Sequence, residues 1–126
     1  MREFIDRLGQ VLDELEEERG PIDFAALIER EETPTKYDLV VAADWINDEM
    51  PFYKLVANKL NRILTDEDWY KYSRTVVLNP KGEFRQEFLR IEPIAREKDM
   101  INFRVANVNV LYAHLFPTHA ANLSYA

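Results

Sequence analysis

The stretch YDLVVAADWI, residues 37–46, decides the fold. Its middle is a continuous apolar run that contains β-branched valine, so we expect a central strand that is covered on at least one side. A polar segment, residues 32–36, precedes this stretch, and the imperfectly alternating residues 22–31 come before that segment. Two strand-like runs joined by a short polar connection predict a hairpin.

The residues after this stretch predict a helix and then a further strand. Asn47 or Asp48 can cap the helix, and Pro51 is tolerated in its first turn. Apolar residues recur at helical spacing through residues 51–64, and residues 73–78 are again strand-like. Because a strand, a helix and a strand follow one another, we expect the two strands to be parallel neighbours.

Residues 2–19 are predicted to form an amphipathic helix that packs on the sheet. An apolar stripe begins at Phe4 and recurs at helical spacing, and an acidic face lies opposite it. Gly20 and Pro21 end the helix, because glycine accepts a left-handed cap and proline cannot continue the helix.

The second half of the chain gives weaker signals. Thr65 and Asp68 have the spacing of a capping box, so a short helix is expected to begin there. Residues 83–91 fit a short helix or an extended segment, and the helix is favoured. Residues 100–112 are strand-like, but the apolar positions change phase at Ala106, which indicates a bulge or a strand buried on both faces.

Together these segments predict one α+β domain spanning residues 1–126. The expected sheet is mixed, with four to five strands in the order α-β-β-α-β-(α)-β, and its helices pack mainly on one face. A chain of 126 residues buries about two-thirds of its unfolded surface, so the core needs no disulfide. The small, polar residues 117–126 are expected to form a mobile tail.

The composition excludes several classes of protein. The chain has no cysteine, which excludes disulfides, thiolate nucleophiles and cysteine-based metal centres. Its formal net charge of −7 opposes binding to a phosphate backbone, so no nucleic-acid partner is expected. We find no secretory signal and no span-length apolar run, so a soluble, cytoplasmic protein without a membrane partner is expected. Three glycines provide no glycine-rich phosphate loop.

Charge is unevenly distributed along the chain. Residues 1–51 carry a net charge of −10, residues 52–90 carry +3, and residues 91–126 are neutral overall. Solvated faces are the simplest interpretation of such blocks. The asymmetry also fits attraction between the first two long helices of one chain, between two copies, or toward a partner.

An acidic cluster follows the stretch that decides the fold. Asp44, Asp48 and Glu49 lie where a strand leads into a helix, which is where α/β proteins place ligands. Carboxylates there could hold Mg²⁺ or Mn²⁺, and Lys54 could contact a phosphate. The competing interpretation is that Asp48 caps the helix and that Glu49 complements its dipole.

Neither the histidines nor the clustered aromatic residues form a recognised motif. His114 and His119 lack the i, i+4 spacing of a zinc-binding helix, and Pro117 separates them, so a surface loop is expected. Residues 69–74 interleave aromatic and basic side chains, a pattern that can stack nucleobases. The acidic residues 66–68 precede them, so core and edge packing is the favoured interpretation.

The sequence therefore favours a non-catalytic protein-interaction or assembly module, with no cofactor. The segment from residue 105 onward lacks charged side chains, and we expect it to provide a sheet edge that another chain can pair with. A homodimer or a complex with another protein is expected. The predicted interaction residues are Val108, Val110, Tyr112, Leu115 and Phe116.

Two alternatives remain open. One is a metal-dependent enzyme that acts on a phosphate ester through Asp44, Asp48 and Glu49. The other is a small-molecule pocket between the sheet and the helices.

Overall fold

The computed structural model describes residues 1–79, 82–91 and 98–118. The helices are α1 (Arg2–Arg19), α2 (Glu49–Ile63), α3 (Asp66–Lys71) and α4 (Glu83–Ile91). The strands are β1 (Phe24–Arg30), β2 (Tyr37–Ala42), β3 (Tyr72–Val77), β4 (Lys98–Val105) and β5 (Val108–Leu115). The predicted α+β class is confirmed, as is the helix favoured for residues 83–91.

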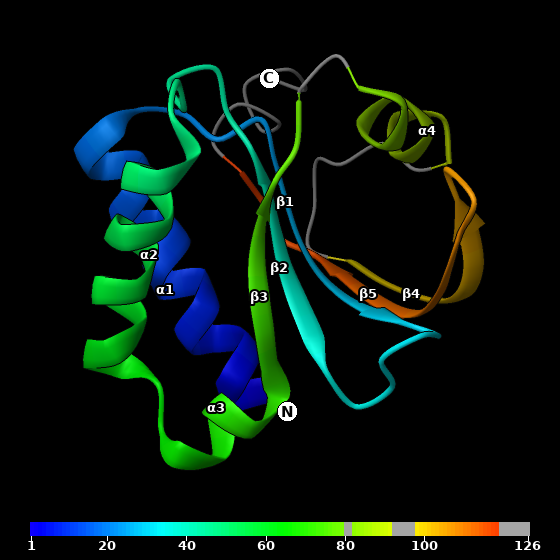
Figure 1. Ribbon diagram of the computed structural model, residues 1–126, viewed down its shortest axis with the longest axis horizontal. Helices are drawn as coiled ribbons and strands as arrows, with labels where there is room; N and C mark the ends of the chain where they lie inside the picture. Colours follow the sequence, from blue (N-terminus) through cyan, green and yellow to red (C-terminus); the bar gives the residue numbers. More distant parts are fainter. Residues whose placement is uncertain (80–81, 92–97, 119–126) are drawn as a thin grey trace.

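The strands form one mixed sheet in the order β3-β2-β1-β5-β4 (Figure 1). β1 is antiparallel to both β2 and β5, and β4 is antiparallel to β5. β2 and β3 are paired and parallel, and the chain connects them through α2 and α3. The predicted hairpin and the predicted parallel pair are therefore both confirmed.

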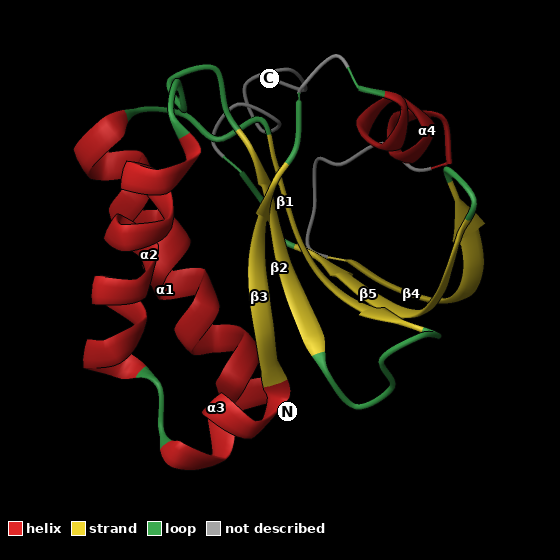
Figure 2. Ribbon diagram, viewed as in Figure 1, coloured by secondary structure: helices red, strands yellow, loops and turns green. Residues whose placement is uncertain are grey.

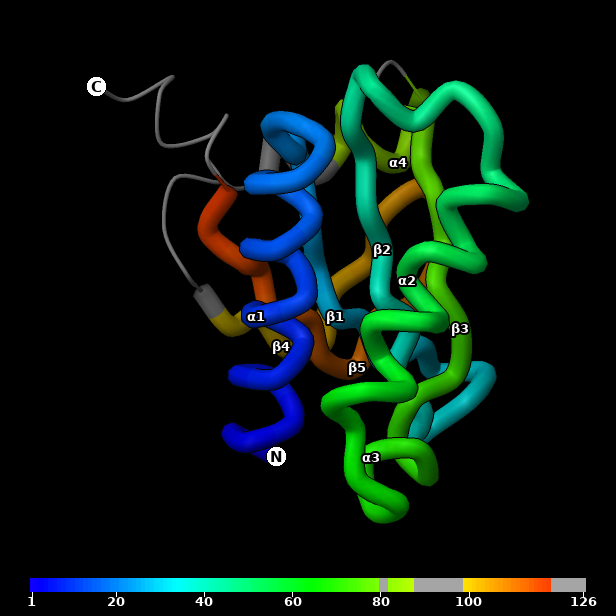
Figure 3. Tube along the Cα trace, turned by 90° about the vertical axis from the view of Figure 1, so that its left-hand side faces the viewer, coloured from blue at the N-terminus to red at the C-terminus, as the bar shows by residue number. Residues whose placement is uncertain are grey.

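The two long helices cover one face of the sheet, with α3 below them (Figure 2). α1 and α2 run in front of the strands when the sheet is seen from this side (Figure 3). Their apolar stripes pack against alternate residues of β1 and β2, because successive side chains of a strand point to opposite faces. This core includes Phe4, Leu8, Leu15, Leu27, Leu39, Val56 and Leu60.

The opposite face is concave, because β5 and β4 curl toward α4 (Figure 1). The intervening side chains of β1 and β2 form a second apolar cluster there with Val110 and Leu115 of β5. The guanidinium of Arg85, on α4, lies 4.9 Å from the centroid of the Phe24 ring. We call this surface the concave face.

Contacts between charged side chains hold the helices together. Nζ of Lys59, on α2, lies 2.8 Å from Glu18 and 3.4 Å from Glu14, both on α1. Arg7 of α1 donates two hydrogen bonds, of 2.5 and 2.9 Å, to the carboxylate of Asp68 on α3. Part of the charge asymmetry is therefore complementarity within one chain.

β2 is shorter than the sequence predicts, and it lies beside β1, which is the middle strand of the sheet. β2 ends at Ala42, and the next residues form a turn that includes Asp44 and Trp45. The indole Nε1 of Trp45 donates to the carbonyl oxygens of Gly20 and Pro21, each at 3.0 Å. Trp45 thus packs at the end of α1 instead of continuing the sheet.

The strand predicted for residues 100–112 is two strands joined by a tight turn. Val105 pairs with Val108, and the two residues between them, Ala106 and Asn107, have φ angles of 47° and 64°. Two successive positive φ angles are typical of a two-residue hairpin turn. The change of phase at Ala106 is therefore a reversal of the chain, and the prediction of a bulge there is wrong.

Little of the predicted tail lies within the described residues. Thr118 is buried, and residues 119–126, including His119, lie outside the described residues. None of the described helices combines the length and the apolar composition needed to cross a membrane.

Candidate functional site

The concave face holds a cavity of about 220 Å³. β1, β2 and β3 form its floor, α4 contributes one wall, and the first residue of β5 contributes another. Most of its lining is apolar. The apolar lining residues are Ile28, Val40, Val76, Leu78, Phe84 and Val108.

Three charged residues from neighbouring strands, Arg30, Asp38 and Arg74, complete the lining, and we call them the Asp38 cluster. Arg30 Nε donates a 2.9 Å hydrogen bond to Asp38 Oδ2. Arg74 Nε lies 3.5 Å from Asp38 Oδ1. The cluster thus places a carboxylate between two guanidinium groups at the polar end of an apolar cavity.

Among the described residues, hydrogen-bond donors reach only one oxygen of the buried Asp38 carboxylate. The Asp38 side chain is 5% exposed. Its Oδ1 atom is buried and accepts no hydrogen bond from the described residues, although Arg74 lies near it. A buried acceptor without a donor is costly, and such an atom at the edge of a cavity is where a ligand can supply the missing donor.

β3 forms the edge of the sheet beside this cavity. Leu78 donates its backbone N–H to the Val41 carbonyl at 2.8 Å, so the amide of residue 78 points toward β2. Successive backbone amides of a strand point to opposite edges, so the amides of Thr75 and Val77 point outward. No described strand pairs with this outer edge.

The structure does not bring the acidic cluster together as a metal site. Asp48 is the N-cap of α2, because its Oδ1 accepts the Met50 N–H at 3.2 Å. Asp44 lies in the turn after β2. Burial of the Asp23 carboxyl raises its pKa, and the negative charge of Asp44 raises it further. Within the described ranges, no group of three or more His, Asp or Glu side chains could hold a metal ion.

The predicted edge strand is an inner strand. β5 lies between β1 and β4, so the expectation of a free edge there is wrong. Among the predicted interaction residues, Val110, Leu115 and Phe116 are buried. Val108 lines the concave-face cavity, and Tyr112 packs edge-on against Tyr37 with ring centroids 6.2 Å apart.

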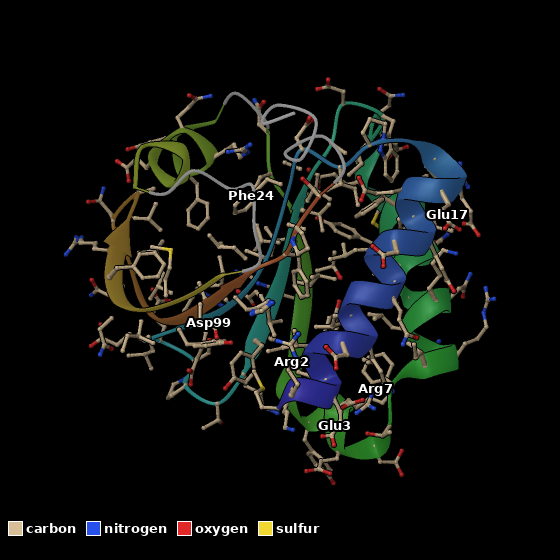
Figure 4. All side chains as sticks on the ribbon, turned by 180° about the vertical axis from the view of Figure 1, so that it is seen from behind. Arg2, Glu3, Arg7, Glu17, Phe24 and Asp99 are labelled. Carbon is tan, nitrogen blue, oxygen red and sulfur yellow. The ribbon has the colours of Figure 1, made fainter. Side chains whose placement is uncertain are left out.

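His114 lies in β5, so the prediction of a surface loop is wrong. The residue is 1% exposed, and its Nδ1 lies 2.6 Å from Oδ1 of Asp99, the residue opposite it on β4. Tyr112 donates its hydroxyl to the same Asp99 oxygen at 2.8 Å. Arg2 of α1 lies on this side of the molecule together with Asp99 (Figure 4).

This arrangement shifts two pKa values. Desolvation acts to raise the pKa of Asp99, but the hydrogen bonds from His114 and Tyr112 bring it below its ordinary value. Burial raises the pKa of Tyr112, and its hydrogen bond to Asp99 raises it further. The cluster binds β4 to β5, and the His114 Nε2 atom is itself buried, so we assign the cluster a structural role.

The residues that form the cavity's polar end were not among the site residues predicted from the sequence. A signal existed at Asp38, which is a charged residue in a strand predicted to be central. Its partners, Arg30 and Arg74, reach it only through strand pairing, and no local pattern marks them.

Comparison of the chain with protein-family models, with curated proteins and with solved structures found no match. We therefore infer a function from the concave-face cavity, the Asp38 cluster and the outer edge of β3.

Proposed function

We propose that the protein is a non-catalytic interaction module that self-associates by pairing β3 with β3 of a second copy. The observation that carries this proposal is the outer edge of β3, with which none of the described strands pairs. An edge strand with free N–H and C=O groups is a ready template for another strand.

A comparison of the two sheet edges favours β3 over β4. β4 contains three charged residues, and Asn102 within it has a left-handed φ of 49°. Charge and backbone distortion both protect an edge from pairing. β3 contains a single charged residue, Arg74, whose side chain is directed to Asp38 on the neighbouring strand.

A two-fold axis at Thr75 supports the geometry of such a pair. Since the Thr75 amide and carbonyl point outward, two antiparallel copies of Thr75 can exchange both backbone hydrogen bonds. Arg74 then lies opposite Val76 of the second copy, so the two arginines do not face each other. The Thr75 hydroxyl is already hydrogen-bonded to the Tyr72 hydroxyl, so the backbone groups carry the pairing. The metal-dependent enzyme has no comparable supporting geometry.

Replacement of Thr75 tests this proposal. Thr75→Pro removes an outward N–H without removing a hydrogen bond to β2, so it blocks pairing while sparing the sheet. Thr75→Val is the matched control, because both variants lose the hydroxyl and only the proline variant loses the N–H. By light scattering at micromolar concentration, we expect twice 14.9 kDa for the wild type and Thr75→Val, and 14.9 kDa for Thr75→Pro.

Hydrogen exchange in the wild-type protein gives a second readout that needs no substitution. In the dimer, the outward amide of Thr75 is protected, and dilution to the monomer releases that protection. A wild-type monomer throughout the micromolar range would overturn the proposal. A dimer that a folded Thr75→Pro variant retains would also overturn it.

A further inference from the structure

The concave-face cavity is large enough for a single small ring compound. Its volume is about 220 Å³. An apolar cavity of about 150 Å³ admits benzene, so this cavity can hold a benzene-sized group with a short substituent. Its apolar walls, including Val40, Val76 and Phe84, suit an aromatic or aliphatic body.

The polar end of the cavity selects the head group of a ligand. Asp38 Oδ1 lacks a hydrogen-bond donor among the described residues, and it would repel an anion. Arg30 and Arg74 flank the same carboxylate and would repel a cation, and because Arg30 also lies 3.5 Å from Glu32 the charges balance and attract neither kind of ion. A neutral hydroxyl avoids both costs, because it can donate to Asp38 and accept from Arg74 at the same time.

The Arg74 side chain can give a ligand access to this oxygen. It is 55% exposed, and its Nε approaches Asp38 Oδ1 at 3.5 Å without forming a hydrogen bond. A small movement of this side chain makes room for a ligand hydroxyl between its Nε and Oδ1, while the 2.9 Å hydrogen bond from Arg30 continues to hold Oδ2. The carboxylate therefore stays in place when the cavity is filled.

We propose that the cavity binds a small neutral alcohol, with its apolar body against β1–β3 and α4 and its hydroxyl between Asp38 and Arg74. The juxtaposition that carries this proposal is a buried, half-satisfied carboxylate at the end of an apolar cavity. The proposal is independent of self-association, because the ligand lies on the concave face and strand pairing uses the outer edge of β3.

Three probes that share a benzene ring test the head group: benzyl alcohol, toluene and benzoate. Each is titrated into the wild-type protein while the backbone amide signals of Val40, Val76 and Phe84 are recorded by NMR. We expect saturable shifts with benzyl alcohol, and binding at least about fivefold tighter than for toluene, because a hydrogen bond to a charged group is gained. Benzoate is expected to bind more weakly than benzyl alcohol.

Two phenylalanine variants test the location. Val76→Phe fills the cavity and is expected to weaken benzyl alcohol binding at least about tenfold. Ile101→Phe, at an exposed position of β4 outside the cavity lining, is the matched control and should bind as the wild type does. Nuclear Overhauser contacts between the probe's ring and the Val76 methyl groups locate the ligand in the wild type, even if Val76→Phe fails to fold.

Several outcomes would overturn the proposal. These are no saturable shift with benzyl alcohol, toluene binding as tightly as the alcohol, or ring contacts outside the cavity. Unchanged binding in Val76→Phe would overturn it too. Because Thr75→Pro leaves the lining intact, its benzyl alcohol affinity distinguishes failure of this site from failure of the proposed dimer.

Discussion

At the scale of single residues, Gly20 controls how α1 joins β1. Its φ of 130° lies in a region that side-chain-bearing residues rarely adopt, and an added Cβ would lie 3.3 Å from Cδ1 of Trp45. We expect Gly20→Ala to lower the free energy of unfolding by about 1–3 kcal/mol, measured by urea denaturation.

Gly9 provides the matched control for that substitution. It lies inside α1, where an added Cβ would make only an ordinary contact with the Phe116 ring at 3.9 Å. Gly9→Ala is therefore expected to raise the free energy of unfolding by about 1 kcal/mol, through helix propensity. Similar destabilisation in both variants would show that backbone conformation at Gly20 is not the cause.

The same residues show what the sequence could predict at this scale. The end of α1 at Gly20 was predictable because the need for a permissive residue is local. The role of Trp45 was not, because the carbonyl groups that bind its indole lie at Gly20 and Pro21, far back in the chain. The Asp38 cluster was hidden for the same reason, since strand pairing alone brings its arginines together.

At the scale of elements, the β4–β5 hairpin turns at a residue that is poorly suited to its conformation. Ala106 has a φ of 47°, which costs a residue with a Cβ roughly 1–2 kcal/mol. Ala106→Gly is expected to raise the free energy of unfolding by about 1 kcal/mol in chemical denaturation.

Ala113→Gly is the opposing control, because Ala113 is a buried residue of β5, where glycine only adds flexibility and removes packing. We expect this variant to be less stable than the wild type. If Ala106→Gly were also less stable than the wild type, the left-handed conformation assigned to Ala106 would be contradicted.

This turn explains why the segment from residue 105 onward was wrongly expected to provide a sheet edge. Ala-Asn is not one of the glycine-containing pairs that mark two-residue hairpins, so the phase change was interpreted within a single strand. The hairpin makes β5 an inner strand and β4 an edge. It also sets His114 opposite Asp99, a contact that no pattern within one strand could predict.

At the scale of the whole molecule, the sequence predicted the helix-covered face better than the concave face. The apolar residues of α1 and α2 recur at helical spacing over long segments, and such a pattern predicts an amphipathic helix reliably. α4 lies on the opposite face, apart from the other helices, and its short sequence does not indicate which face it covers (Figure 1). The cavity lies where that helix meets the sheet, so its place could not be predicted without knowing which face α4 covers.

Ion pairs between elements also make the stability of the whole molecule depend on pH. The hydrogen bond from Arg7 lowers the pKa of Asp68 despite burial, and the pKa of Asp99 is also lowered. Groups whose pKa falls on folding stabilise the protein when ionised. The free energy of unfolding is therefore expected to decrease as the pH falls below about 4. Asp23 acts oppositely, because burial raises its pKa and its contribution is lost as the pH rises.

Asp68→Asn separates this effect from general acid sensitivity. The asparagine side chain cannot be ionised, so we expect a variant that is less stable than the wild type at neutral pH and loses less stability on acidification. Urea denaturation at neutral pH and at about pH 3 measures the difference. Asp66→Asn, at an exposed position of the same helix, is the control and should retain the wild-type dependence. An equal acid-induced loss in Asp68→Asn and the wild type would mean that the link between α1 and α3 does not govern acid unfolding.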